Sequence, residues 1–375
     1  MKLIITTAFG LESVVAKELE KLGYEKTTTD NGRIILDGTY EDICRLNLNV
    51  SAGERVVICA NTFKATSFDE LFDSTRNTPW EKYIPADAAV TVDAKSVNSA
   101  LFSLSDCQRI VKKAIVERLK YGHSVKTIPE TGALYPVTVS IHNDIAELLI
   151  DTSGDGLHKR GWRTKAGDAP LKETLANAMA ALSFWRPERP LIDPMCGSGT
   201  ILIEAALREM RVAPGHSRHF VCENWKNVTS DMWNKVRFEA AARNRSEEIL
   251  PLLDICGFDI DRRVLEAARS NAKNAGIADA IHFQQRDFSE FSSKKQYGCI
   301  ITNPPYGERI GDKAAMNKIY AAFRNAMKEL PTWSFYVLTA DENFENEICR
   351  KADKKRKLYN GRIKVDYYQF YGPRP

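Results

Sequence analysis

The tetrapeptide Asn303-Pro304-Pro305-Tyr306 combines residue types that could hold a flat heterocycle carrying an exocyclic amine. The Asn303 side-chain oxygen and the Pro304 carbonyl could each accept a hydrogen bond from an NH2 group. Prolines stiffen the backbone and keep both acceptors in place, and the Tyr306 ring could stack on the base. An apolar run at 299–302 predicts a buried strand directly before these residues. We therefore expect all four to be catalytic, the alternative being an ordinary Pro-rich turn at a strand end.

A glycine-rich turn upstream could bind a nucleoside. Residues 191–200 predict a strand and a glycine turn, and a helix is expected to follow over 201–210. A dinucleotide fingerprint would need glycine where Leu202 stands, and the Gly-Lys-Ser/Thr of a P-loop is absent. A nucleoside with a carboxylate tail, such as S-adenosylmethionine, fits better. The expected cofactor contacts here are Asp193, Pro194, Met195, Cys196, Gly197, Ser198, Gly199 and Thr200.

Two further strand ends carry acidic residues. Residues 256–261 predict a strand that ends at Asp259, followed by a helix over 262–274 that Asp261 would cap. Asp259 could accept hydrogen bonds from ribose hydroxyls, and its neighbour Ile260 is included in the expected site. A third strand at 281–285 leads to Asp287, which could accept the adenine amino group while Phe288 flanks the ring. Each acid could instead be a helix cap or a solvated strand end. The glycine loop, Asp259, Asp287 and the segment from Asn303 nevertheless follow one another on successive strand ends, and this order favours a cofactor site.

These segments resemble a class I S-adenosylmethionine-dependent methyltransferase of the amino-group type. More narrowly, the chain is similar to bacterial methyltransferases that modify guanine N2 in 23S ribosomal RNA and carry a THUMP domain. The resemblance covers essentially the whole chain and rests on residues 155–161, 169–175, 193–200 and 303–309. It implies an α/β fold, with a Rossmann-like seven-stranded class I methyltransferase domain preceded by an α+β ferredoxin-like/THUMP RNA-binding module. It also implies that Leu171, Lys172 and Glu173 cover the cofactor pocket.

The expected domain boundaries follow from the same resemblance. They are residues 1–55 for the ferredoxin-like region, 56–155 for the THUMP RNA-binding domain, 156–169 for a linker and 170–375 for the methyltransferase domain. In the first two domains the patterns predict strands at 2–7, 32–36, 55–61, 89–93 and 137–141, and helices at 11–22 and 40–48. Ser105 to Gln108 predict a capping box for a helix that runs to Tyr121.

Basic residues in two segments could contact RNA phosphates, although a solvated charged surface is the alternative. The expected contacts are Arg109, Lys112 and Lys113 in the THUMP domain, and His158, Lys159, Arg160 and Arg163 in the linker. An insertion at about 211–253, with a helix over 230–245, could be a packed element or a wall of the base pocket. Within it, His216 and Arg218 are further candidates for RNA contacts.

The C-terminal segment tests the fold without any motif. A helix is predicted at 317–330 and a strand at 334–339, and the last two strands should flank Asn360-Gly361. Asn-Gly between β-rich runs is a strong hairpin signal. A parallel sheet that ends in an antiparallel hairpin is the methyltransferase arrangement and differs from a plain dinucleotide fold.

Bulk properties agree with this interpretation. The chain has 375 residues and a formal net charge of +4, which permits a nucleic-acid partner without requiring one. Its eight cysteines lack C-x-x-C pairs and His partners, so we expect neither disulfides nor a metal site, and Cys196 is expected to be a small buried residue. No signal peptide or membrane-length apolar run is evident, so a cytoplasmic protein is expected.

The expected function is methyl transfer from S-adenosylmethionine to the exocyclic N2 amine of a guanine in 23S ribosomal RNA. The motif alone leaves two alternatives, a transfer-RNA guanine-N2 enzyme and an adenine-N6 enzyme that acts on DNA or RNA. A non-catalytic RNA-binding assembly factor of the same fold is a third alternative from a different class. The intact Asp193, Gly197, Gly199, Asn303 and Tyr306 favour an enzyme.

Overall fold

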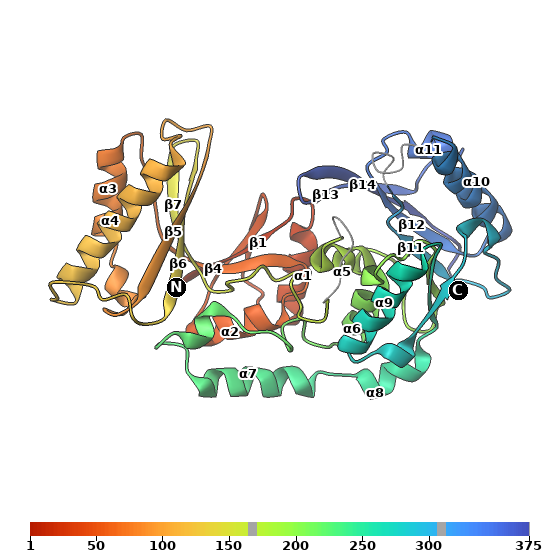
Figure 1. The fold of residues 1–375 in the computed structure, drawn as a ribbon, viewed down its shortest axis with the longest axis horizontal. Helices are drawn as coiled ribbons and strands as arrows, with labels where there is room; N and C mark the ends of the chain where they lie inside the picture. Colours follow the sequence, from red (N-terminus) through yellow and green to blue (C-terminus); the bar gives the residue numbers. More distant parts are fainter. Residues whose placement is uncertain (164–170, 306–312, 375) are drawn as a thin grey trace.

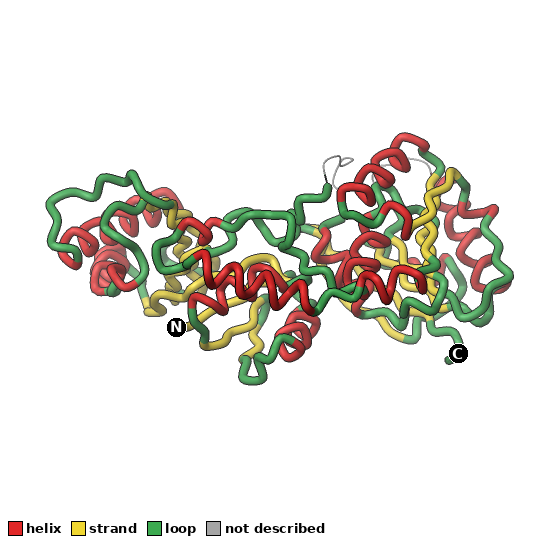
Figure 2. Tube along the Cα trace, turned by 90° about the horizontal axis from the view of Figure 1, so that it is seen from below, coloured by secondary structure: helices red, strands yellow, loops and turns green. Residues whose placement is uncertain are grey.

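Two seven-stranded β-sheets organise the chain, one in each half. The computed structural model describes residues 1–163, 171–305 and 313–374, so the predictions for Tyr306 and for 164–170 lie outside the described residues. In Figure 1 the N-terminal sheet extends from the left lobe into the centre of the molecule, and the C-terminal sheet lies in the right lobe. Seen from below in Figure 2, the molecule is elongated, with its two ends formed by these lobes.

The N-terminal sheet is continuous across the two expected N-terminal domains. Its strands lie in the order β2-β3-β1-β4-β7-β6-β5. Their bounds are β1 (Lys2–Thr7), β2 (Thr28–Asp30), β3 (Arg33–Asp37), β4 (Gly53–Lys64), β5 (Ala89–Val97), β6 (Leu134–His142) and β7 (Ile145–Asp151). The twelve-residue β4 pairs with β1 through its first half and with β7 through its second half. The boundary expected after residue 55 therefore falls inside a single strand that joins both parts.

Helices pack against this sheet, and their apolar side chains are buried in the same core as those of its strands. They are α1 (Glu12–Lys21), α2 (Tyr40–Asn49), α3 (Phe68–Asn77), the 3-10 turn η1 (Trp80–Lys82) and α4 (Leu104–Gly122). In α4 the side chains of Val111, Ile115 and Leu119 are buried, as a helical apolar stripe requires. The predicted capping box at Ser105 is wrong, because the N-cap of α4 is Ser103. Its hydroxyl donates to the Asp106 carboxylate at 2.6 Å and does not cap a backbone N–H.

The C-terminal sheet has the order β10-β9-β8-β11-β12-β14-β13, with five parallel strands followed by an antiparallel hairpin. This is the predicted Rossmann-like seven-stranded arrangement. The strands are β8 (Leu191–Asp193), β9 (Ile255–Asp259), β10 (Ile281–Gln285), β11 (Cys299–Thr302), β12 (Ser334–Thr339), β13 (Lys354–Asn360) and β14 (Ile363–Phe370). The predicted hairpin is present, but Asn360 still pairs with Ile363, so the turn residues are Gly361 and Arg362.

Helices pack on both faces of this sheet, as Figure 2 shows. One face carries α5 (Glu173–Ala181), α6 (Thr200–Glu209) and α9 (Arg262–Asn274), and its core merges with that of the N-terminal lobe. The other face carries α10 (Lys313–Glu329), α11 (Phe344–Glu347) and the 3-10 turn η5 (Phe288–Glu290) around an aromatic core. Parallel strands buried on both faces explain the near-continuous apolar runs of β8, β11 and β12.

The insertion is a packed element of the fold. Its main helix, α7 (Ser230–Ala242), lies along α2 at the lower side of Figure 1. Arg45 of α2 pairs with Glu239 of α7 at 3.1 Å, and Trp233 stacks on Phe220 at 5.4 Å between ring centroids. The short helix α8 (Ser246–Ile249) and the 3-10 turns η2 (Val221–Asn224), η3 (Leu250–Leu252) and η4 (Ala278–Ala280) complete the chain.

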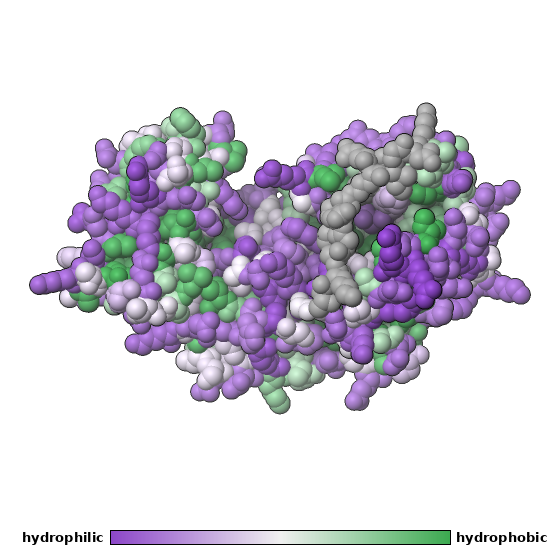
Figure 3. All heavy atoms as spheres, in the orientation of Figure 1, coloured by the Kyte–Doolittle hydropathy of each residue, from purple (hydrophilic) through white to green (hydrophobic). Residues whose placement is uncertain are grey.

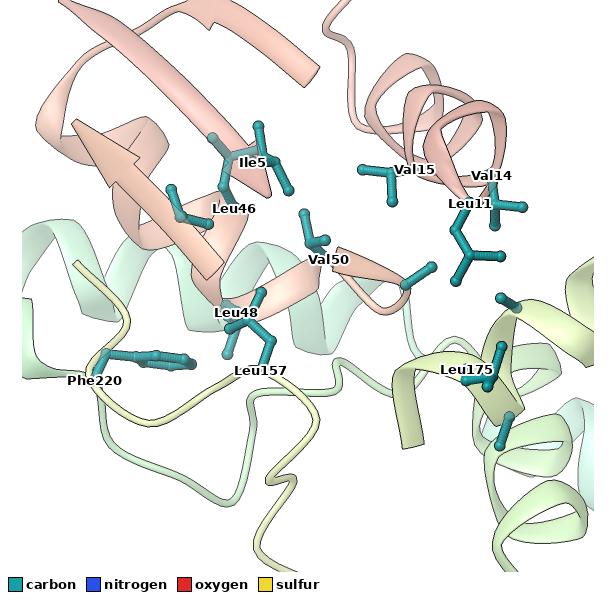
Figure 4. Packing of buried hydrophobic residues seen from close by; sticks show 14 of the residues in the cluster. Ile5, Leu11, Val14, Val15, Leu46, Leu48, Val50, Leu157, Leu175 and Phe220 are labelled. Carbon is teal, nitrogen blue, oxygen red and sulfur yellow. The ribbon is translucent and has the colours of Figure 1, made fainter. Parts of the chain in front are cut away.

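Most residues in the first half of the expected linker, 156–163, are buried or half-buried, although Lys159 and Gly161 are exposed. Leu157 and Trp162 lie in the core shared by the two lobes. Figure 4 shows Leu157 beside Leu48 of α2. In the same view, Leu175 of α5 lies below Leu11. Arg160 is only 2 % exposed and pairs with Glu204 of α6 at 3.2 Å. The segment therefore belongs to a packed joint between the lobes.

We expect Arg160→Leu to lower the free energy of unfolding by about 3–5 kcal/mol, because it leaves the Glu204 carboxylate buried without its cation. The measurement is the urea midpoint by tryptophan fluorescence. Lys159→Ala serves as the control, because Lys159 pairs with Asp155 in an exposed ion pair worth at most about 1 kcal/mol. Equal midpoints for the two variants would contradict a structural role for the buried pair.

Candidate active site

The segment 303–305 and the loop 193–200 lie at the carboxyl ends of the neighbouring strands β11 and β8. These strands are parallel neighbours, with Cys299 opposite Leu191 and Ile300 opposite Ile192. Asn303, Pro304 and Pro305 follow β11 directly, and Asp193 ends β8, so the two segments project from one sheet edge about 5 Å apart. This edge, where neighbouring crossovers diverge, is where ligands bind in open α/β sheets. Tyr306, the fourth predicted catalytic residue, lies outside the described residues.

The loop from Pro194 to Gly199 connects β8 to α6 and has the shape expected of a ligand-binding turn. Gly197 and Gly199 have φ angles of 51° and 79°, which glycine adopts most readily. A Cβ atom on Gly199 would lie 3.0 Å from the Phe283 ring, so this glycine allows close packing. A Cβ atom on Gly197 would meet nothing within 4 Å, so the backbone of Gly197 faces open space where a ligand can approach.

Asp259 of β9 holds the same loop in place. Its Oδ2 accepts a hydrogen bond from the Gly197 N–H at 2.9 Å, and its Oδ1 accepts one from the Asp261 N–H at 3.0 Å. The long insertion does not separate Asp259 from the loop, because β9 pairs directly with β8. Burial raises the pKa of Asp259. Ile260, next in the chain, is 67 % exposed at the same edge and offers an apolar surface beside the carboxylate.

Asp193 is the most deeply buried carboxyl group of the site, at 1 % exposure. Its Oδ1 accepts a hydrogen bond from the Met195 N–H at 3.2 Å. Burial, with a smaller effect of the nearby Asp259 carboxylate, raises the pKa of Asp193 to about 7. A cation placed at this edge would favour the ionised form.

The remaining loop residues are held by the protein. Cys196 is buried, its N–H donates to the Phe258 carbonyl at 2.8 Å, and burial raises the pKa of its thiol. The Ser198 carbonyl accepts a hydrogen bond from Asn271 of α9 at 3.1 Å. Asn271 was missed by the sequence analysis, although it stands among Leu265, Ala268 and Ala272 on the apolar face of α9. A polar residue in such a stripe is the signal that could have identified it.

At the end of β10, Asp287 and Phe288 have local structural contacts. The Asp287 carboxylate caps η5 by accepting a hydrogen bond from the Ser289 N–H at 2.8 Å, and these bonds with Ser289 lower its pKa. The Phe288 ring packs edge-on against Phe323 at 4.9 Å between centroids, in the aromatic core. Their expected contacts with an adenine ring stay predictions.

Arg163 brings the segment 171–173 to the glycine loop. Its guanidinium donates to the Leu171 carbonyl at 2.9 Å and to the Thr200 hydroxyl, and it pairs with Glu173 at 3.2 Å. Burial lowers the pKa of Arg163 and raises that of Glu173. These contacts leave the Arg163 side chain only 10 % exposed, and its expected contact with RNA stays a prediction. The neighbouring Lys172 points elsewhere and pairs with Glu54 of β4 at 3.1 Å.

Two predicted RNA contacts are buried arginines that bind other parts of the protein. Arg160 pairs with Glu204 in the joint between the lobes. Arg218 donates hydrogen bonds to the carbonyls of Asp155, Gly156 and Lys159. Both predictions are wrong, because each guanidinium is surrounded by protein acceptors.

The remaining predicted RNA contacts reach the surface to different extents. Arg109, Lys113 and Lys159 are exposed, and His158 and Lys112 are half-buried. His158 lies 3.8 Å from Glu54, and Lys112 pairs with Glu130. The exposed His216 bonds to the Ala213 carbonyl at 3.0 Å.

Within residues 1–163, 171–305 and 313–374, no helix is long and apolar enough to cross a membrane. The same residues contain no group of three or more His, Cys, Asp or Glu side chains that could hold a metal ion.

Comparison with known proteins defines the class of this chain. Residues 160–369 match the family described as "RMKL-like, methyltransferase domain", residues 2–57 match the "RlmL ferredoxin-like domain" and residues 65–151 match the "THUMP domain". The first match covers more than half of the chain. The chain therefore belongs to the RMKL-like methyltransferase family, and the resemblance to THUMP-containing class I S-adenosylmethionine-dependent methyltransferases is confirmed.

Individual relatives agree over their full lengths. The chain is 47 % identical to the Bacillus subtilis protein named "Putative RNA methyltransferase YpsC", over 98 % of this chain and 95 % of that protein. A Listeria monocytogenes structure described as "a predicted N6-adenine-specific DNA methylase" is 46 % identical, with a TM-score of 0.93 over 99 % of this chain and 96 % of that chain. The structure of SMU.472, "a putative methyltransferase complexed with SAH", is 42 % identical, with a TM-score of 0.94 over 100 % and 98 %.

The buried Asp193 carboxyl predicts pH-dependent binding of S-adenosylmethionine. Because its pKa is raised to about 7, the ligand-free folded protein holds a proton here between about pH 4 and 7 and loses stability as the pH rises through that window. The cationic cofactor favours the ionised acid. We expect its affinity to rise by up to about tenfold per pH unit between pH 5.5 and 7, measured by calorimetry.

Two variants test the assignment of this pH dependence. Asp193→Asn should flatten it, whereas Asp287→Asn should keep the slope, because the pKa of Asp287 is already lowered. A wild-type affinity that does not change over this range would refute the prediction.

Proposed function

We propose that this methyltransferase transfers a methyl group from S-adenosylmethionine to the exocyclic N2 amine of a guanine in 23S ribosomal RNA. The observation that carries the proposal is the adjacency of Asn303 and Pro304 to the loop 193–200 at one sheet edge. This arrangement suits a flat amine-bearing base beside a nucleoside methyl donor. SMU.472 was crystallised with SAH, the compound that remains after such a donor loses its methyl group.

The choice of RNA rests on the N-terminal half and on the relatives. A THUMP domain precedes the methyltransferase domain, and the Bacillus subtilis relative is named an RNA methyltransferase. The choice of guanine N2 in the large ribosomal subunit rests on the whole-chain resemblance, which includes the RlmL ferredoxin-like domain. The domain division 1–55, 56–155, 156–169 and 170–375 is part of the same proposal.

In the proposed reaction, the nitrogen lone pair of the amine attacks the methyl carbon while the carbon–sulfur bond breaks. The electron pair of that bond goes to sulfur, which becomes neutral, and the nitrogen then loses a proton to water. The amine is a weak nucleophile because its lone pair is delocalised into the ring. The Asn303 side-chain oxygen and the Pro304 carbonyl would each accept a hydrogen bond from the amine, orient its lone pair and stabilise the positive charge that develops on nitrogen. Tyr306 would stack on the base and Pro305 would stiffen the turn.

Most of the rate acceleration would then come from positioning, which can contribute roughly 7–11 kcal/mol. The donor already carries a good leaving group. A base in helical RNA would have to leave its stack before it could reach this edge.

We expect Asn303→Ala to lower the turnover number by about 10²–10³, because one acceptor for the amine is lost, while S-adenosylmethionine binding persists. Methyl transfer is measured with labelled cofactor and binding by calorimetry. Asn227→Ala, in the insertion where its amide donates to the Tyr40 hydroxyl, is the matched control with unchanged activity. Full activity of Asn303→Ala would remove this residue from the mechanism.

The substrate is tested with ribosomal RNA from cells that lack the protein. We expect one methyl group per large subunit, recovered as N2-methylguanosine after nucleoside analysis. The Listeria relative is described as an adenine-specific DNA methylase, so duplex DNA is assayed in parallel, together with transfer RNA. N6-methyladenosine in any substrate would overturn the choice of guanine, and N2-methylguanosine in transfer RNA alone would overturn the choice of ribosomal RNA.

A further inference from the structure

The segment 351–364 is the most basic part of the C-terminal domain. Within fourteen residues it contains one acid, Asp353, and seven cations: Lys351, Lys354, Lys355, Arg356, Lys357, Arg362 and Lys364. The structure folds most of this segment into the hairpin of β13 and β14 at the end of the sheet. Formation of the hairpin does not by itself require this concentration of positive charge.

The tip of the hairpin lies at the same sheet edge as the active site. β14 is antiparallel to β12, and Asp366 near its start pairs with Thr339 at the carboxyl end of β12. The turn at 361–362 therefore projects beyond the carboxyl ends of the parallel strands. Between β11 and β13 there are three strand spacings, so the hairpin stands about 15 Å from the strand that carries Asn303. A nucleotide next to the target base, or one further along, can reach that distance.

A pocket of about 570 Å³ separates this hairpin from the N-terminal lobe. Its lining residues are Ala8, Phe9, Glu54, Lys172, Lys357, Tyr359 and Gly361. In Figure 3 the upper surface is hollowed between the two lobes, and strongly hydrophilic side chains border the hollow on the side of the C-terminal lobe. Lys172 is next to Leu171, which Arg163 connects to Thr200 of the glycine loop. The pocket is thus a neighbour of the cofactor loop.

Two aromatic rings form one wall of the pocket. Phe9 is 49 % exposed, and its ring meets Tyr359 edge-on at 6.0 Å between centroids. The lobes touch closely beside them, because a Cβ atom on Gly10 would lie 2.6 Å from the Lys357 carbonyl oxygen. With its φ of 91°, Gly10 allows a contact that other residues would prevent. The rings are therefore held by packing while the Phe9 face stays open to a ligand.

The cations at the hairpin tip differ in whether they pair with a carboxylate. Lys355 pairs with Asp366 and Lys364 pairs with Glu342. Among the residues that the structure describes, neither Lys357 nor Arg362 has a carboxylate within 4 Å.

The acid in the pocket, Glu54, is neutralised by its neighbours. Burial raises its pKa, but His158 and Lys172 outweigh this and lower the pKa of Glu54 to about 2. Glu54 is therefore ionised at physiological pH, and the paired Lys172 balances its negative charge.

We propose that this pocket and the hairpin tip bind the RNA strand that flanks the target nucleotide. Lys357 and Arg362 contact its phosphates, and Phe9, supported by Tyr359, stacks on one of its bases. The inference rests on the proposed function, because it takes RNA as the substrate. It assigns the C-terminal hairpin a share of substrate binding in addition to that of the N-terminal domains.

A competing explanation is that lysines on an edge strand prevent pairing with another sheet. That role needs charge along β13 but needs neither an arginine in the turn nor an exposed aromatic ring on the opposite lobe. The two explanations differ in what they predict for RNA binding.

The charge test uses the full-length double variant Lys357→Glu/Arg362→Glu and a ribosomal RNA fragment that the wild type methylates. Loss of two phosphate contacts should weaken RNA binding by about 10- to 50-fold near 0.1 M salt and should reduce the slope of log K against log salt by about 1.5. The matched control, Lys294→Glu/Lys328→Glu, makes the same charge change on exposed residues at the opposite edge of the sheet. S-adenosylmethionine affinity should be unchanged in both.

The stacking test uses Phe9→Leu and Phe9→Tyr. Leucine keeps the apolar volume and loses the flat ring, so the KM for RNA should rise about tenfold while the turnover number at saturating RNA is kept. Tyrosine should restore the wild-type KM. If the wild type methylates RNA but both Lys357→Glu/Arg362→Glu and Phe9→Leu match their controls in affinity, salt slope and KM, this inference is wrong. If the wild type methylates no RNA, the proposed function itself fails.

Discussion

The buried ion pair between Arg160 and Glu204 is the contact on which the arrangement of this molecule depends. The guanidinium of Arg160 bonds to Glu204 of α6, to the Leu157 carbonyl and to the Ser51 carbonyl of the N-terminal lobe. α6 begins at the glycine loop, so one side chain connects the N-terminal lobe to the helix that follows this loop. A charge buried to this degree persists only with such a complete set of partners.

Because of this joint, the lobes are not independent modules on a flexible tether. Arg208 of α6 adds a bond to Glu18 of α1, and the apolar core runs without interruption from β1 to α9. The shared β4 likewise fixes the THUMP part to the ferredoxin-like part. Removing the residues up to Asp151 would expose this core and strip Arg160 and Arg208 of acceptors. The division of labour between the lobes is therefore better tested with point variants of the full chain than by truncation.

The sequence was sufficient to predict the features that depend on local chemistry. The bounds of α9, β10 and β12 agree with the prediction, since each has a strong period and clear end signals. The sequence was insufficient to predict the burial of Arg160 and Arg218. Their burial depends on acceptors far away in the chain, such as Glu204 for Arg160, and no local pattern encodes such partners. The positions of Asp193 and Asp259 beside one loop could be anticipated from strand order, but the hydrogen bond from Gly197 to Asp259 could not.

The electrostatics of the loop also favour a positively charged ligand. Asp193 is buried and Asp259 is half-buried, and within the described part of the chain neither carboxylate has a Lys, Arg or His nitrogen within 4 Å. A sulfonium with an ammonium group bound beside these acids would supply the missing positive charge, and the attraction would be stronger than in water because the surroundings are poorly polarisable. Methyl transfer removes the sulfonium charge and leaves the acids less well compensated. The same two carboxylates that recruit the proposed donor would therefore hold its product more weakly, and this difference favours exchange of the spent nucleoside for a new donor.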